Sequence, residues 1–206
     1  MKFLNGLSFS WFDIFLLLWL TLGLFRGRKR GMSAELLTFL QWATIVLVCA
    51  FTYQPISEFL SKSPTKFTPL FANITGYLLA AGVVSLAFML LKRLLGGKLI
   101  GSDTFGRWEY YLGMPAGVLR YLCMVLTGLA LLNARLYTAA EIKAYKDFQM
   151  KNFDSEFFPG LQKIQADVFG VSFSGGFIKK QLSILLIQPK GQGGRDPFKQ
   201  KPWEGP

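Results

Sequence analysis

The sequence predicts an all-α, polytopic membrane protein with four transmembrane helices and a short helical C-terminal tail. Of the 206 residues, 51% are hydrophobic and only 17% are charged, whereas soluble domains keep about 25% of their residues charged. The mean hydropathy is positive, at +0.34. The apolar residues also form long runs with basic loops between them. We therefore expect a transmembrane domain (1–135), an amphipathic helical tail (136–187) and a disordered C-terminus (188–206).

The first apolar run covers residues 11–25 and ends in the basic sequence RGRKR, residues 26–30. A secretory signal peptide carries its positive charges before the apolar segment, but only Lys2 precedes this run. We therefore expect an uncleaved membrane anchor whose N-terminus lies outside the cytoplasm.

The second and third runs each have about the 20 residues that a helix needs to cross a bilayer. The second covers residues 34–53, and its only charge is Glu35 at the start. A polar stretch with three prolines follows, and the third run then covers residues 70–91 and ends at Lys92-Arg93. Both runs are predicted to be transmembrane helices.

The fourth run covers residues 110–134 and contains Pro115 and a lone Arg120. One interpretation starts the helix at the first residue of this run. The other makes residues 104–115 a short interfacial segment, with the crossing beginning near Ala116. We expect the second, because an arginine in the middle of a bilayer is costly unless it is paired or reaches the surface.

Lysine and arginine in the short loops predict the orientation. The loops after the first and third runs carry four each, whereas the N-terminus carries one and the loop after the second run carries two. The first and third loops are therefore expected in the cytoplasm, and both termini on the outer side. The tail beyond residue 134 carries 11 Lys and Arg, which conflicts with an outer location unless long segments translocate regardless of charge. If the fourth run does not cross, the tail is cytoplasmic.

The tail has three short apolar patterns. The first predicts an amphipathic helix from about Leu136 to Asn152, and the second follows Pro159-Gly160. The third, residues 177–187, is apolar but too short to span a bilayer.

Several classes of site are excluded by composition. The chain has no histidine, which removes the commonest general base and the usual nitrogen ligand of metals. Cys49 and Cys123 lie in apolar runs without a CxxC neighbour, so we expect neither a disulfide framework nor a zinc site. No nucleophile elbow, phosphate-binding loop or HExxH motif is present, and the serines of residues 170–175 are interpreted as loop residues. We expect no catalytic, cofactor-binding or metal-binding residue, no cofactor and no enzyme activity.

The net charge of +11 raises the question of nucleic acid, because phosphates attract basic surfaces. The basic residues of the first 134 positions, however, cluster between the apolar runs, which is typical of membrane topology signals. We expect membrane lipids as partners, together with other membrane proteins or a second copy of the chain, and no nucleic acid.

Three charged residues near the predicted membrane could carry a function. Asp13 is either an ion or proton relay group or helix-packing partner, or a carboxylate favoured by the positive end of its own helix. Glu35 and Arg120 are either an ion pair at the lipid boundary or two independent groups, with Arg120 reaching the surface and Glu35 capping its helix.

Small residues offer a second type of candidate. Gly113 and Gly117 form a GxxxG motif, and Gly76 with Ala80 forms a similar pair. Such spacing lets helix backbones approach closely, although it is frequent in apolar helices. The run RGRKRG is a topology determinant and a candidate contact for anionic lipid head groups.

The arrangement resembles the colicin V production protein family. The residues that carry the resemblance are Asp13, Arg26-Gly27, Arg30-Gly31 and Glu35, followed by Asp103, Gly113, Gly117 and Arg120. They match in order and in helix placement over roughly residues 10–135. Two positions depart from the pattern, because Asp103 lies ten residues before Gly113 where the family has about four, and Tyr121 stands where glycine is usual.

The resemblance implies a small bacterial inner-membrane protein with four membrane helices. It implies a non-enzymatic accessory role in production or export of the peptide toxin colicin V, with a wider role in maintenance of the cell envelope. The family has no established catalytic residues. The alternative is a small oligomeric transporter or channel, in which Asp13, Glu35 and Arg120 line a polar path between subunits.

Overall fold

The computed structural model describes residues 10–61, 69–96, 106–134 and 160–188, with four single residues between the last two segments. All elements in this part of the chain are helices. They are α1 (Trp11–Arg30), α2 (Met32–Ser61), α3 (Pro69–Leu94), η1 (Gly106–Trp108), α4 (Glu109–Leu132), α6 (Leu161–Ala166), η2 (Asp167–Val171), α7 (Phe173–Gln181) and η3 (Ser183–Leu185).

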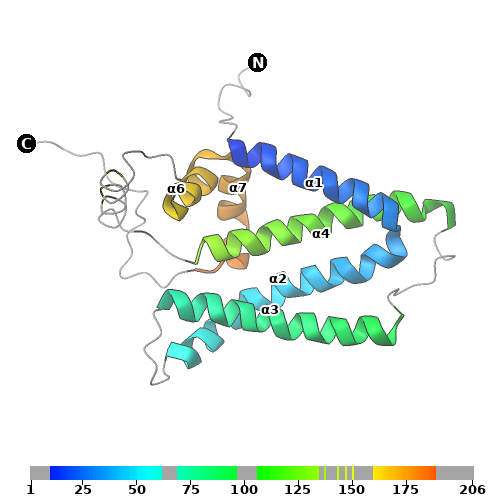
Figure 1. Ribbon diagram of the computed structural model, residues 1–206, viewed down its shortest axis with the longest axis horizontal. Coiled ribbons are helices and arrows are strands. Elements are labelled where there is room, and N and C mark those ends of the chain that lie inside the picture. The colour runs from blue at the N-terminus through cyan, green and yellow to red at the C-terminus, as the bar shows by residue number, and fades with distance from the viewer. Residues whose placement is uncertain are drawn as a thin grey trace, which may run out of the picture.

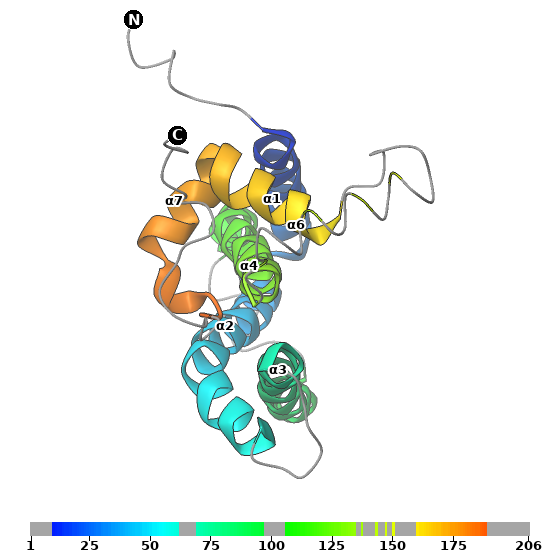
Figure 2. The same ribbon diagram turned by 90° about the vertical axis from the view of Figure 1, so that its left-hand side faces the viewer.

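The four long helices lie side by side in the spatial order α1, α4, α2, α3 (Figures 1 and 2). Each runs opposite to the one before it in the chain, so α2 and α4 run in the same direction. A single residue, Gly31, connects α1 to α2. Its φ of 76° lies in a region that glycine adopts without steric cost, which permits this sharp reversal.

Three of these helices are long and apolar enough to cross a membrane: α2 over Met32–Leu60, α3 over Phe71–Leu94, and η1 with α4 over Gly106–Leu132. The first helix is not among them. Its 20 residues include Asp13 and four basic residues in the last five positions. The uncharged part, residues 14–25, is therefore only about 18 Å long at 1.5 Å per residue. Three of the four predicted spans have the expected length and composition, and the crossing of α1 stays a prediction.

The second helix extends further than its apolar run. It continues through Pro55 to Ser61, although a proline inside a helix removes one backbone hydrogen bond. Helix α3 packs closely against this region, because a Cβ added at Gly76 would lie 3.1 Å from the carbonyl oxygen of Tyr53. The Ser57 hydroxyl also donates to Asn73 Oδ1 of α3, at 2.6 Å. Contacts with α3 thus stabilise the last helical turns of α2, in a segment that the sequence pattern assigned to a loop.

The expected start of the last long helix near Ala116 is wrong. Helix α4 runs without a break from Glu109 to Leu132, with Pro115 inside it, and η1 precedes it directly. The prediction placed Arg120 near the membrane surface to avoid the cost of a buried charge. The structure meets that cost by pairing Arg120 with a carboxylate, as described below, so the helix does not need a late start.

The tail packs across the end of the bundle at which α1 begins (Figure 2). Its apolar residues Val168 and Ile187 are buried in the same core as Leu129 of α4. Polar contacts join it to the long helices as well: Gln165 Nε2 donates to the Leu132 carbonyl at 3.0 Å, Asn133 Nδ2 to the Ile187 carbonyl at 2.9 Å, and the Gln188 amide to the Tyr53 hydroxyl at 3.0 Å.

The tail predictions have different outcomes. The pattern after Pro159-Gly160 forms α6, as predicted, and the apolar residues 177–187 contribute to α7 and η3, although α7 starts earlier, at Phe173. The helix expected over residues 136–152 and the disordered end expected over residues 188–206 lie outside the described residues, apart from isolated positions.

Candidate functional site

Helices α1 and α4 meet along a row of glycines that we call the glycine seam: Gly23, Gly27 and Gly31 on one side, Gly113 and Gly117 on the other. The spacing of four residues places each set on one helix face. A Cβ added at Gly27 would collide with the Gly113 carbonyl oxygen, and one added at Gly117 would lie 2.8 Å from the Gly27 Cα. The two backbones are therefore in direct contact, and only glycine fits between them. The sequence predicted the GxxxG motif on α4 but not the matching row on α1.

A buried ion pair joins α2 to α4 beside the glycine seam. Arg120 Nη1 donates to Glu35 Oε1. Glu35 is fully buried and Arg120 is 5% exposed. The structure therefore brings together the two charges that the sequence offered as a possible pair, and places them between helices instead of at the surface.

Further cations surround this carboxylate. Arg30 Nη1, at the end of α1, lies 3.6 Å from Glu35 Oε2. Lys92 of α3 donates to Gln41 Oε1 at 2.6 Å and is close enough to interact electrostatically with Glu35. Glu35 thus faces cations from α1, α3 and α4. We call Glu35, Arg120, Arg30 and Lys92 the charge cluster.

The charge cluster is polar but incompletely hydrogen-bonded. Among the described atoms, Glu35 Oε2, Arg120 Nε and the nearby Ser33 hydroxyl are buried without a hydrogen-bond partner. The Arg120 guanidinium also lies over the Tyr121 ring, 5.1 Å from its centroid, a favourable cation–π geometry. The cluster connects α2 to α1 and α4 by ion pairs, and Lys92 places a further cation from α3 near it.

Asp13 lies at the opposite end of α1 and accepts hydrogen bonds from two helix starts. Its Oδ2 accepts from the Ser10 amide at 2.9 Å, which caps α1 itself. The amides of Phe173 and Ser174 in the first turn of α7 donate to the same carboxylate at 3.3 and 2.9 Å. A helix N-terminus carries unpaired N–H groups and a partial positive charge. Asp13 is therefore both the favoured terminal carboxylate and a packing partner of the tail, and we name this contact the Asp13 cap.

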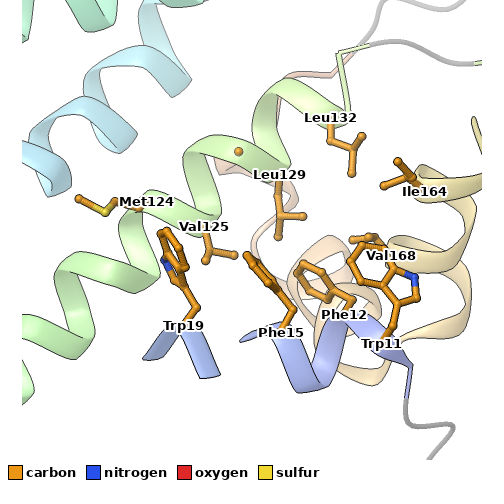
Figure 3. A pocket seen from close by; sticks show the side chains of 11 residues that line it. Trp11, Phe12, Phe15, Trp19, Met124, Val125, Leu129, Leu132, Ile164 and Val168 are labelled. Atoms are coloured by element: carbon orange, nitrogen blue, oxygen red, sulfur yellow. The ribbon is translucent and has the colours of Figure 1, made fainter. Parts of the chain in front are cut away.

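A groove of about 370 Å³ lies beside the Asp13 cap, between α1, α4 and the tail (Figure 3). Aromatic rings of α1 form one wall, side chains of α4 the other, and Ile164 and Val168 of the tail close one end. Its residues are Trp11, Phe12, Phe15, Trp19, Met124, Val125, Gly128, Leu129, Leu132, Ile164 and Val168. None of them is ionisable, so the groove accepts apolar chains and offers no chemistry of its own.

Comparison with protein-family models matches residues 12–164 to the colicin V production protein model. The match covers most of the chain. This chain belongs to the colicin V production protein family. Curated proteins and solved structures give no match.

The family match extends about 30 residues beyond the resemblance seen in the sequence, into α6. It contains the glycine seam, the charge cluster and Asp13, but it ends before α7. In this colicin V production family member, the tail residues that contact Asp13 thus lie outside the matched region.

Not every predicted residue joins these sites. Arg26 is exposed on α1 and is not among the described ion-pair partners of Glu35, whereas Arg30 of the same basic run is. Both cysteines are free, Cys49 buried against the Tyr77 carbonyl and Cys123 partly buried. Within the described part of the chain, no group of three or more Cys, Asp or Glu is placed to hold a metal ion.

Sequence reasoning missed Lys92 and Ser172. Lys92 was assigned to topology alone, and its contact with Gln41, 51 residues away, leaves no local signal. Ser172 caps α7 by accepting from the Gly175 amide at 2.9 Å. A serine directly before the first apolar residue of a helical pattern is a known capping signal, and Ser172 directly precedes Phe173, so the sequence contained the signal for this residue.

Replacing Asp13 with asparagine is expected to loosen the tail while the long helices stay folded. An asparagine turns an N–H₂ group toward amides that need an acceptor, and it lacks the charge that favours a helix start. The loss is about 1–3 kcal/mol. Amides of residues 173–176 should exchange hydrogen about 5- to 150-fold faster, the factor to which this loss corresponds, with no change in α2 and α3. Asp167→Asn, an equal change of charge within the tail, is the control. Equal exchange in both variants would contradict the role of the Asp13 cap.

Proposed function

We propose that this colicin V production family member is a non-enzymatic accessory protein of the bacterial inner membrane, which supports toxin production or export and maintenance of the cell envelope. The observation that carries the proposal is the use of its buried charges. Glu35 and Arg120 bind each other, and Asp13 binds two helix starts. These groups connect helices and do not converge on a cavity where a substrate would react. In a host without the toxin, the envelope role is the operative one.

We also propose that both termini lie on the outer side of the membrane. The basic ends of α1 and α3 lie at one end of the bundle, and the tail packs at the other, with the start of α1 (Figure 1). This arrangement agrees with the rule that short basic loops stay in the cytoplasm. A C-terminal fluorescent protein that matures only in the cytoplasm should stay dark, and bright cells would contradict the orientation.

A deletion strain tests the accessory role. In a bacterium that makes colicin V, loss of this chain is expected to lower the toxin in the medium, and expression of the wild type to restore it. Expression of Gly27→Ala, which disrupts the glycine seam, should not restore it, whereas Gly128→Ala should. Unchanged toxin release together with unchanged sensitivity to detergent would contradict both proposed roles.

A transporter or channel is the second candidate, and the incomplete hydrogen bonding of the charge cluster favours it. A path for ions requires polar groups without permanent partners inside the membrane. Liposomes that contain the purified protein distinguish the two. We expect no ion flux with the wild type, whereas a flux that Glu35→Gln abolishes would replace the accessory role with transport.

A further inference from the structure

A second hollow, of about 450 Å³, lies at the other end of the α1–α4 pair and has a different character. Phe25, Arg28 and Lys29 of α1 line it together with Tyr110 and Tyr111 of α4. Two of these five residues are cations and none is an acid, so the hollow attracts anions. We call it the basic hollow.

The cations of the basic hollow are not used elsewhere in the described structure. Arg30, their neighbour in the last turn of α1, lies beside Glu35, but no ion pair of Arg28 or Lys29 occurs among the described residues. The acid next in sequence to the tyrosines, Glu109, is buried and faces Gly31, where an added Cβ would lie 2.7 Å from its Cγ. Among the residues that the structure describes, the positive charge of the hollow therefore has no acid paired with it.

Aromatic side chains complete the hollow. Phe25, Tyr110 and Tyr111 are each more than half exposed, and the Trp108 ring lies 6.1 Å from that of Tyr111. Tyrosine and tryptophan concentrate where a membrane protein meets the head-group layer. Trp108, Tyr110 and Tyr111 lie at the start of the candidate membrane span Gly106–Leu132. If this helix crosses a bilayer, its start lies near the phosphates of the phospholipids.

We propose that the basic hollow binds one phospholipid with a net negative head group. Arg28 and Lys29 contact the phosphate, the two tyrosines contact the head group and glycerol, and the acyl chains follow Phe25 into the hydrocarbon layer. A lipid fits better than a free anion, because three of the five lining residues are aromatic, and a lipid can cover this surface as well as supply the negative charge. This lipid site is separate from the contacts proposed for the accessory role, so either can fail without the other.

Native mass spectrometry of the detergent-purified protein tests the proposal, with phosphatidylglycerol and phosphatidylcholine as competing probes. The wild type is expected to retain one phosphatidylglycerol in preference to phosphatidylcholine. Arg28→Gln/Lys29→Gln is expected to bind it about 30-fold more weakly, because each basic residue at an anionic lipid surface contributes about fivefold. Arg26→Gln/Arg93→Gln removes the same charge from exposed positions outside the hollow and should bind like the wild type.

Three results would overturn the proposal. Equal retention of both lipids by the wild type would show that the hollow does not prefer an anionic head group. This comparison uses the wild type alone, so it does not depend on whether a variant folds. If both double variants bind phosphatidylglycerol equally weakly, the effect comes from the overall charge of the protein and not from the hollow. Displacement of the lipid by millimolar inorganic phosphate would assign the hollow to a free anion.

Discussion

Replacing Glu35 with glutamine is expected to lower the free energy of unfolding by about 3–5 kcal/mol, the usual loss when one partner of a buried ion pair is removed. Glu35 is the carboxylate of the charge cluster and is fully buried. Without it, Arg120 would face Arg30 and Lys92 with no compensating charge. Unfolding by sodium dodecyl sulfate in mixed micelles measures the change.

Replacing Arg120, the other partner of the ion pair, should lower the free energy of unfolding by less. In Arg120→Gln, Glu35 keeps Arg30 as a neighbour at 3.6 Å, and Arg30 still reaches solvent, with 42% of its side chain exposed. The charge-swapped double variant should recover only part of the loss, because an arginine at position 35 would face Arg30. Glu58→Gln makes the same chemical change at an exposed position of the same helix, and as the control it should cost no more than about 1 kcal/mol, the upper value for an exposed charge contact. A larger loss in Arg120→Gln than in Glu35→Gln would contradict this account.

Gly27→Ala is expected to destabilise the protein although it adds only one methyl group. Alanine is a better helix former than glycine by about 1 kcal/mol, so the change would stabilise an isolated helix. In the glycine seam, however, the methyl group would occupy the position of the Gly113 carbonyl oxygen, and backbone cannot turn away as a side chain can. We expect a net loss of about 3 kcal/mol, the upper end of the range for overpacking.

Gly128→Ala in α4 is expected to change the free energy of unfolding in the opposite direction. An added Cβ there meets nothing within 4 Å, so only the helix-forming preference remains, and a gain of up to about 1 kcal/mol should follow. Both variants are measured in the same micelle titration. Similar behaviour of Gly27→Ala and Gly128→Ala would show that α1 and α4 do not depend on close contact.

The sequence predicted what depends on one helix at a time. Runs of apolar residues located α2 and α3, and the GxxxG spacing located one side of the seam. It could not decide between alternatives that depend on contacts across 85 residues, such as whether Glu35 pairs with Arg120 or the two act independently. That gap also explains the wrong start of α4, because the position of a helix in the membrane depends on whether its arginine has a partner.

Asp13 shows the same limit from another side. The sequence offered Asp13 as a carboxylate favoured by the start of its own helix, and in the structure the Ser10 amide donates a hydrogen bond to it. The second helix that it caps lies 160 residues away, and no spacing rule connects the two. On sequence alone, a packing partner and a carboxylate that favours its own helix start are separate alternatives for Asp13. In the structure, Asp13 is both, because it accepts from the Ser10 amide and from two amides of α7. Its use as a relay group stays untested.

The Asp13 cap also has a consequence for the order of events during synthesis. It joins Asp13 to residues that lie 160 and 161 positions later in the chain. Everything up to the start of α7 must therefore leave the ribosome before this contact can form. Contacts at such separation form late, after local helices. A nascent chain that stops before α7 contains all four long helices, but its Asp13 carboxylate lacks the hydrogen bonds from Phe173 and Ser174. The start of α1 therefore gains its full set of hydrogen bonds only after α7 has been synthesised.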